Sequence, residues 1–152
     1  MRDSSLVSIL LTLVLVGLGT SALHAQGPGV QRLADDEAVE VSMAKLTSIN
    51  YRRGKALPKE VEELDGQLVR IEGYMAMGTL EGVDTFEFVP ESCECGRSKV
   101  QHFIDVTIEE GVTTFRPGRF YLEGVLSVGE FEEDGFVVSL YRLTVPTFDD
   151  EE

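Results

Sequence analysis

Alternation of apolar and polar positions runs through the second half of the chain, and a period of two predicts β-strands. In each run every second residue is apolar, aromatic or glycine, so one face of the strand would lie against a core. The runs that show this pattern are Leu68–Met75, Thr85–Val89, His102–Ile108, Arg119–Val128 and Phe136–Val145. Glu133-Asp134-Gly135, just before the last run, is typical of a tight hairpin turn.

The segment upstream of these runs has a mixed pattern. Residues 38–51 fit either a strand or a helix, because apolar residues recur there both at every second position and at helical spacing. Pro58 and the acidic residues after it predict a short helix over 58–64, with proline in its first turn. Asp65-Gly66 would end that helix. The chain therefore places a short helix ahead of its strands.

Five short strands favour a small barrel over a sandwich, which usually needs seven or more strands. Gly73 and Gly124 lie inside predicted strands, where glycine permits the tight bends that a small barrel needs. We therefore expect a mainly β protein over residues 38–146. Its fold would be a five-stranded, partly open barrel like the OB fold, which binds oligonucleotides and oligosaccharides, preceded by the short helix.

The N-terminus has the three parts of a secretory signal peptide, predicted over residues 1–25. A weakly positive start is followed by an apolar run from Leu6 to Gly19, and Ala25 offers a small residue for cleavage before Gln26. This run is shorter than the roughly 20 residues that span a bilayer, so the membrane would be met only transiently during export. The expected location is periplasmic or secreted, with an N-terminal membrane anchor as the alternative.

Residues 26–37 begin Gln-Gly-Pro-Gly and predict a flexible leader, and residues 147–152 predict an acidic tail. The chain has a formal net charge of −14, which disfavours nucleic-acid partners because their phosphate backbones would be repelled. Such acidity is compatible with a cation, a basic protein partner, or solubility outside the cell. A single basic cluster, Arg52-Arg53-Gly54-Lys55, follows Tyr51.

Three stretches of the chain resemble a family of exported bacterial proteins catalogued as domain-of-unknown-function family 3299. They are Leu64–Met75, Phe86–Pro90 and Tyr121–Leu126, and the resemblance extends over about residues 39–145. It implies an OB-like domain outside the cytoplasm with no established activity, and an association of some relatives with zinc-uptake systems implies metal handling. The family's commoner loop has a cysteine and a histidine followed by prolines, from which this chain departs.

The loop that differs holds the only two cysteines, Cys93 and Cys95, between the second and third predicted strands. With His102 they would offer two thiolates and an imidazole, and Glu91 and Glu94 would add carboxylate oxygens. Zinc and cuprous copper take such ligands, so either metal is the cofactor that the loop would bind. Against this, zinc sites normally space their cysteines by two to four residues and add a second pair.

Two other hypotheses fit the same cysteines. Cys93 and Cys95 could form a strained, easily reduced disulfide of a thiol-disulfide redox protein, although such proteins usually carry Cys-x-x-Cys at the start of a helix. They could equally be a structural clip, or buried small residues that hold the loop against the barrel. His102 has its own alternative, as a residue at the edge of the core on the face of Ile104 and Val106.

No catalytic residue is assigned, because no reacting group stands beside an activating partner, and a binding or accessory module is favoured over an enzyme. Its ligand would be a metal ion or a protein partner. Aromatic residues that an OB barrel could use for stacking are Tyr74, Phe103, Tyr121 and Tyr141. Glu72 and Glu123 beside them argue against a polyanion, though not against a sugar or a peptide.

Overall fold

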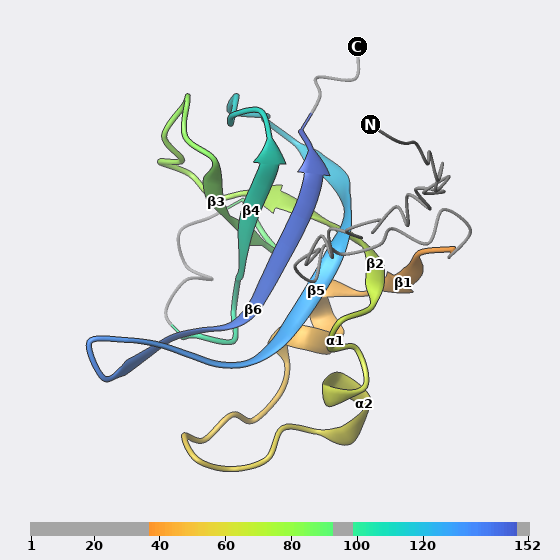
Figure 1. The fold of residues 1–152 in the computed structure, drawn as a ribbon, viewed down its shortest axis with the longest axis vertical. Helices are drawn as coiled ribbons and strands as arrows, with labels where there is room; N and C mark the ends of the chain where they lie inside the picture. Colours follow the sequence, from red (N-terminus) through yellow and green to blue (C-terminus); the bar gives the residue numbers. More distant parts are fainter. Residues whose placement is uncertain (1–36, 93–98, 149–152) are drawn as a thin grey trace, which may run out of the picture. The chain divides into compact units, whose positions relative to one another are not determined.

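The computed structural model describes residues 37–92 and 99–148. Within these ranges its elements are β1 (Val39–Val41), α1 (Met43–Thr47), α2 (Lys59–Glu62), β2 (Leu68–Met75), β3 (Thr85–Val89), β4 (Ile104–Glu110), β5 (Arg119–Glu133) and β6 (Phe136–Thr147) (Figure 1). The predicted signal peptide, its cleavage site at Ala25 and Gln26, and nearly all of the leader lie outside the described residues, as do Cys93, Glu94 and Cys95. No helix of the described part is long and apolar enough to cross a membrane.

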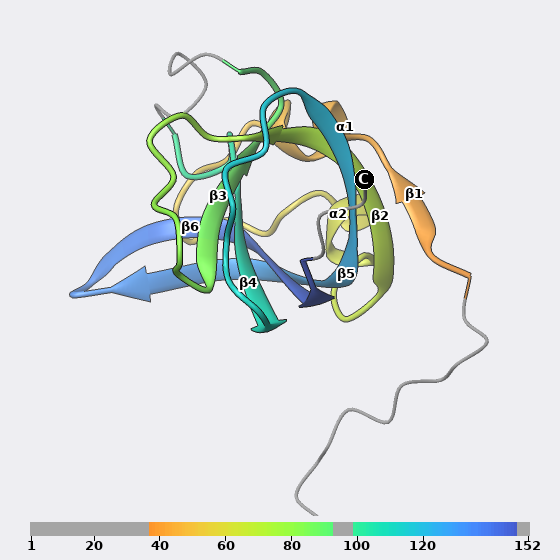
Figure 2. The same cartoon turned by 90° about the horizontal axis from the view of Figure 1, so that it is seen from above.

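Five of the strands form a closed barrel in the order β2-β3-β4-β6-β5, which β5 completes by pairing with β2 (Figure 2). The β4–β6 pair is parallel, and the other barrel pairs are antiparallel. This confirms the predicted mainly β, five-stranded OB-like fold. The barrel is closed where the sequence suggested a partly open one, because β2 and β5 pair continuously from Leu68↔Val125 to Tyr74↔Arg119.

Two strands begin and end as predicted, and β4 is the one whose start the alternation misplaced. β2 and β3 have the predicted bounds. β4 begins at Ile104 rather than His102, because Lys99 to His102 form a turn in which the His102 amide donates to the Lys99 carbonyl oxygen at 2.9 Å. His102 therefore precedes the strand and is half-buried. The next residue, Phe103, packs against Ala76 and Val89.

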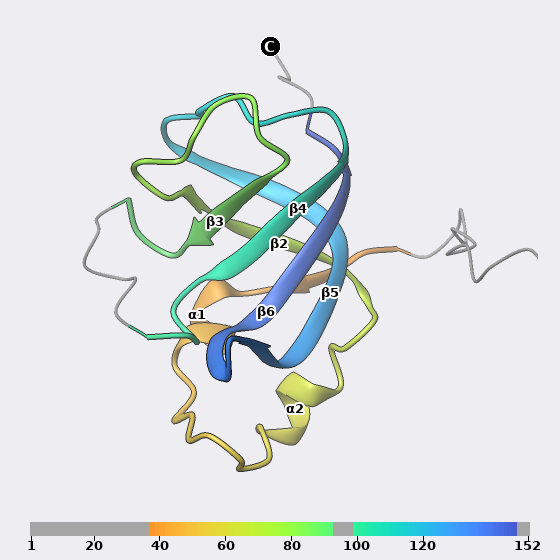
Figure 3. The ribbon, with the colours of Figure 1, turned by 60° about the vertical axis from the view of Figure 1, so that its left-hand side comes forward.

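The mixed pattern of residues 38–51 belongs to two successive elements. β1 pairs in parallel with β2, from Val39↔Val69 to Val41↔Ile71, and α1 follows directly. Met43 and Leu46 of α1 are buried in the core. α2 confirms the predicted short helix, and Figure 3 shows both helices at one end of the barrel.

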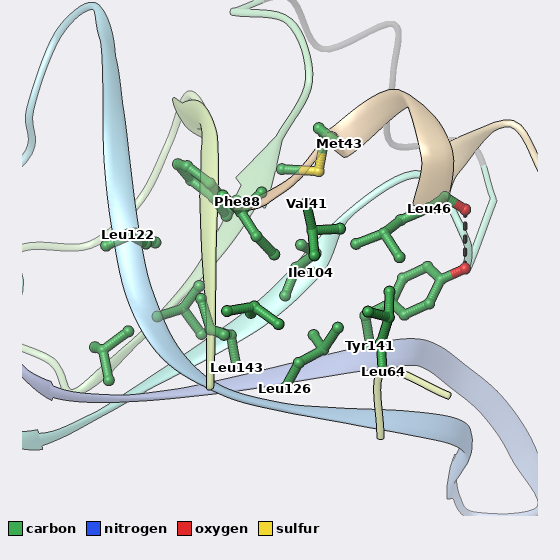
Figure 4. Close-up of a cluster of buried hydrophobic side chains, with 14 of the residues drawn as sticks. Val41, Met43, Leu46, Leu64, Phe88, Ile104, Leu122, Leu126, Tyr141 and Leu143 are labelled. Carbon is green, nitrogen blue, oxygen red and sulfur yellow. Dashed lines mark hydrogen bonds between the residues drawn. The ribbon is translucent and has the colours of Figure 1, made fainter. Parts of the chain in front are cut away.

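The core fills the barrel interior and the space between α1 and the barrel (Figure 4). Tyr141 is fully buried, and its hydroxyl donates a hydrogen bond of 2.8 Å to the Leu46 carbonyl oxygen, so it ties β6 to α1. Burial raises the pKa of Tyr141, since the phenolate would lose its hydration there. Packing continues to Phe148, whose ring lies 5.4 Å from that of Phe86.

β5 changes partners near Gly124. Val125 pairs with both Leu68 of β2 and Thr144 of β6, so the strand bends where it passes from one neighbour to the other. A Cβ atom on Gly124 would collide with the backbone carbonyl oxygen of Thr144. The absence of a side chain at this position therefore allows β5 and β6 to approach closely enough to close the barrel.

Beyond the barrel, β5 and β6 continue as a projecting hairpin, residues 129–137, which we call the tongue (Figure 2). Asp134 and Gly135 at its tip have φ values of 50° and 80°, as the predicted tight turn requires. The basic segment 51–55 holds the tongue. Glu130 Oε1 accepts hydrogen bonds from the Tyr51 hydroxyl at 2.9 Å and the Gly54 amide at 2.7 Å.

Arg53 adds to this contact, which we call the latch. Its guanidinium pairs with the Glu132 carboxylate and donates to the Gly135 carbonyl oxygen at 3.0 Å. The hydrogen bonds from Gly54 and Tyr51 lower the pKa of Glu130 below its ordinary value, because they stabilise the carboxylate. Part of the only basic cluster in the sequence is thus used inside the molecule to fix the tongue.

Candidate functional site

A groove of about 600 Å³ opens on the outside of the barrel, bordered by β1, α1, β2 and β5. Its floor is the outer face of β2 and β5, and its wall includes the two residues that follow β3. The residues that line it are Glu40, Val41, Ser42, Met43, Ala44, Arg70, Glu72, Pro90, Glu91, Arg119 and Tyr121. We call this cavity the groove.

The strand register explains which side chains meet on the groove floor. Alternation along β2 directs Arg70, Glu72 and Tyr74 outward, because Val69, Ile71 and Met75 are buried in the core. The antiparallel ladder sets these three residues opposite Glu123, Tyr121 and Arg119 of β5. The parallel ladder sets Glu40 of β1 beside Arg70. Charged and aromatic residues therefore alternate across three neighbouring strands.

Arg70 and Tyr121 form the most accessible pair of the groove. The Arg70 guanidinium lies 4.5 Å from the centre of the Tyr121 ring, and Tyr121 is 48% exposed. Arg70 is itself exposed, and none of the ion pairs found within the described residues involves it. The pair can offer a ligand a flat apolar surface and hydrogen-bond donors at the same place.

Arg119 is held more firmly by its neighbours. It lies 5.3 Å over the ring of Tyr74 and 3.5 Å from a carboxylate oxygen of Glu72. A hydrogen bond with Tyr74 raises the pKa of Arg119 above its ordinary value, and the negative charge of Glu72 acts in the same direction. Tyr74 itself packs against the small cluster formed by Ala76, Val89 and Phe103. Arg119 thus supports the floor, whereas Arg70 is open to a ligand.

The groove adjoins the segment in which the sequence placed a metal site. Pro90 and Glu91 form part of its wall, and Cys93 comes two residues after Glu91. Of the predicted ligands, Glu91 is exposed at the groove and His102 is half-buried after its turn, while Cys93, Glu94 and Cys95 lie outside the described residues. Across residues 37–92 and 99–148 no three histidine, cysteine or acidic residues are grouped to hold a metal. Metal binding by this loop stays a prediction.

The sequence predicted some of the outward-facing residues of this site but not Arg70. Of the four aromatic residues proposed for stacking, Tyr74 and Tyr121 lie on the outer face, whereas Phe103 and Tyr141 are buried. Arg70 was not singled out, although alternation in Leu68–Met75 already assigns it to the polar face. Its partner Tyr121 comes from a strand about 50 residues later, and only the β2–β5 register brings the two together.

Fold and groove together define a small β-barrel protein with a polar groove on its outer face, in which Tyr121 supplies an aromatic surface. The chain is similar in structure to a DUF3299 family protein from Pseudomonas aeruginosa PAO1, with 16% sequence identity and a TM-score of 0.49. The match covers 77% of this chain and 100% of the other, and it names the family that the sequence resembles. No protein-family model and no curated protein matches the chain. The function is therefore argued from the groove.

Proposed function

We propose that this protein is a non-enzymatic binding module that works outside the cytoplasm and that its groove receives an extended segment of a partner protein. The observation that carries the proposal is the accessible stack of Arg70 on Tyr121. Arginine and tyrosine are enriched among the residues that contribute most to protein–protein binding. The export signal predicted over residues 1–25 supports a site of action in the periplasm or outside the cell.

The charges of the groove indicate the kind of segment that would fit. The exposed guanidinium of Arg70 suits a carboxylate of the partner, and Glu40 suits a basic side chain next to it. A polyanion would meet the carboxylates of Glu40 and Glu72, so nucleic acid remains disfavoured. A peptide segment that carries both signs of charge around an apolar side chain matches the lining best.

The described lining favours binding over catalysis. Its hydroxyl groups belong to Ser42 and Tyr121, and among the described residues that line the groove there is no histidine to activate them. Ser42 is exposed, and its hydroxyl oxygen accepts no capping hydrogen bond at the start of α1. Acyl transfer or a related nucleophilic reaction would need a base beside such a hydroxyl.

Photo-crosslinking tests the proposal directly. A benzophenone amino acid replaces Tyr121 in the full chain, expressed in its native host, and we expect ultraviolet light to join it to one partner. The substitution Arg70→Ala should abolish the crosslink, whereas Arg52→Ala, which removes an exposed arginine of the segment 51–55, should leave it intact. The same probe at Lys59, on α2, should give no adduct. A Tyr121 crosslink that is absent, or that persists without Arg70, contradicts the proposal.

The metal and redox hypotheses for Cys93 and Cys95 are tested separately. Thiol titration and intact mass of aerobically purified protein show whether the cysteines are bridged. Metal analysis of protein prepared under reduction should find stoichiometric zinc or copper that is lost in Cys93→Ser if the loop binds metal. Absence of metal above background would refute metal binding, and a bridged pair with a strongly negative reduction potential would refute a redox role.

A further inference from the structure

Two loops lie at the end of the barrel away from α1 and α2 (Figures 1 and 3). Both expose large apolar side chains. Residues 76–84 join β2 to β3, and residues 111–118 join β4 to β5. The exposed fractions are 53% for Met77, 70% for Leu80, 52% for Val112 and 39% for Phe115. We call these four residues the loop patch, and none of them lines the groove.

Buried Thr113 fixes the two loops to each other. Its hydroxyl donates to the Leu80 carbonyl oxygen at 2.6 Å, and its amide donates to the Val83 carbonyl oxygen at 2.7 Å. Its own carbonyl oxygen accepts from the Gly82 amide at 2.9 Å. With only 1% of Thr113 exposed, these bonds are shielded from water. Leu80 and Val112 are therefore presented together on a preorganised surface, which lowers the entropic cost of binding.

Exposed acidic residues lie close to the loop patch along the chain. They are Glu81 and Asp84 in the first loop and Glu110 at the end of β4, just before the second loop. The only basic residue of the two loops is the half-buried Arg116, whose guanidinium lies 5.2 Å over Phe120 and 4.8 Å over Phe148. The loop patch is thus apolar, and the carboxylates of Glu81, Asp84 and Glu110, which we call the acidic rim, flank it in the sequence.

We propose that the loop patch docks a basic, amphipathic segment of a partner protein. A surface that exposes several large apolar side chains is typical of an interaction site, because their contact with water is unfavourable and a bound partner would remove it. The acidic rim selects the occupant. It would repel the same rim on a second copy and the anionic headgroups of a membrane, and it would attract lysine and arginine. This surface is separate from the groove and does not depend on the function proposed for it.

A designed peptide tests the inference with the full purified chain. The probe is a fluorescein-labelled amphipathic peptide built from leucine and lysine, and the matched control peptide carries glutamate in place of lysine. We expect the basic peptide to bind and the acidic one to fail. The double substitution Leu80→Ser, Val112→Ser leaves the charge unchanged and should weaken binding about tenfold or more. Phe136→Ser, at the tongue tip where Phe136 is 71% exposed, should have no effect.

Three results would overturn the proposal. The first is that the double variant binds the basic peptide as well as the unchanged chain does. The second is that the protein sediments with vesicles of phosphatidylglycerol and phosphatidylethanolamine and that this sedimentation requires Leu80 and Val112. The third is that the protein forms a dimer that the two substitutions dissociate. Circular dichroism checks that the double variant folds. If it does not, Glu81→Lys provides the test at an exposed position. That variant should weaken the basic peptide and improve the acidic one, and no change with either peptide would refute the proposal.

Discussion

At the scale of single residues, Gly124 is the position that barrel closure constrains most. A methyl group there would collide with the Thr144 carbonyl oxygen, a backbone atom that cannot turn aside. We expect Gly124→Ala to lower the free energy of unfolding by about 1–3 kcal/mol, because β5 and β6 would have to separate. Urea unfolding followed by circular dichroism measures this difference.

Gly129→Ala is the matched control, since it makes the same substitution on the same strand. A Cβ atom on Gly129 would have no heavy atom within 4 Å, and we expect its unfolding midpoint to stay near that of the unchanged chain. Equal effects of the two substitutions would show that the close approach of β6 does not cause the loss at Gly124, because the lower backbone freedom of alanine by itself favours the folded state.

Tyr141 gives a second prediction at this scale. Tyr141→Phe would leave the buried Leu46 carbonyl oxygen without its hydrogen bond, at a cost of about 1–2 kcal/mol. The ordinary tyrosine pKa is 10.0 and burial raises it in the folded state, so the unfolded chain loses this proton first as the pH rises. The stability that Tyr141 contributes is complete below pH 10.0 and falls above it. Urea unfolding at several pH values should show a shallower alkaline loss in Tyr141→Phe, and identical slopes would contradict the assignment.

At the scale of elements, the latch makes the tongue sensitive to acid. The folded pKa of Glu130 lies below its ordinary value of 4.5, so its contribution is present above pH 4.5 and is lost as the pH falls through the folded value. As the pH falls through the folded pKa of Glu130, we expect the backbone amides of residues 129–137 to lose protection from hydrogen exchange. In the Glu130→Ala variant these amides should be weakly protected at every pH. Glu123→Ala, on the barrel part of β5, should retain the normal acid response. Protection that persists in Glu130→Ala would show that the latch does not hold the tongue.

The strands also show what alternation in the sequence can and cannot predict. β2 and β3 were located correctly because apolar residues in them face one continuous core. β4 was started two residues early, since the sequence of His102 and Phe103 continues the alternation while the turn from Lys99 interrupts the strand. The sequence near Val128 carries no signal that β5 leaves the barrel there and continues as a strand. The predicted end at Val128 therefore omitted the extension of β5 into the tongue. Turns and partner exchange depend on contacts that lie outside the strand.

The candidate sites needed information that only the assembled barrel provides. The outward direction of Arg70 and Tyr121 follows from local alternation, but their stacking follows from the antiparallel register of β2 and β5. The loop patch likewise depends on Thr113, whose hydrogen bonds reach Leu80 across 33 positions. The sequence directed attention to Cys93 and Cys95 because cysteines are rare in it, whereas exposed arginine, tyrosine and leucine are ordinary until their neighbours are known.

At the scale of the whole molecule, negative charge is the dominant property. The formal net charge of the chain is −14. In the groove Arg70 and Arg119 offset part of the charge of the glutamates that line it, whereas Glu130, Glu132, Glu133 and Asp134 make the tongue acidic. This negative charge would assist binding at both proposed surfaces, because it attracts a partner segment with basic residues before that segment makes specific contacts. The same charge opposes compaction, since like charges lie closer together in the folded chain than in the unfolded one.

Salt should therefore stabilise the protein, although it weakens individual surface ion pairs. The screening length falls from about 10 Å at 0.1 M to about 3 Å at 1 M ionic strength, so added NaCl should reduce repulsion over the whole surface. The exposed Arg53–Glu132 pair would lose strength, but exposed pairs contribute little. We expect the midpoint of thermal unfolding to rise with NaCl, and to rise less in Glu109→Lys, Glu110→Lys, where the net charge is smaller. A midpoint that falls as NaCl is added would show that local ion pairs such as the latch outweigh global repulsion.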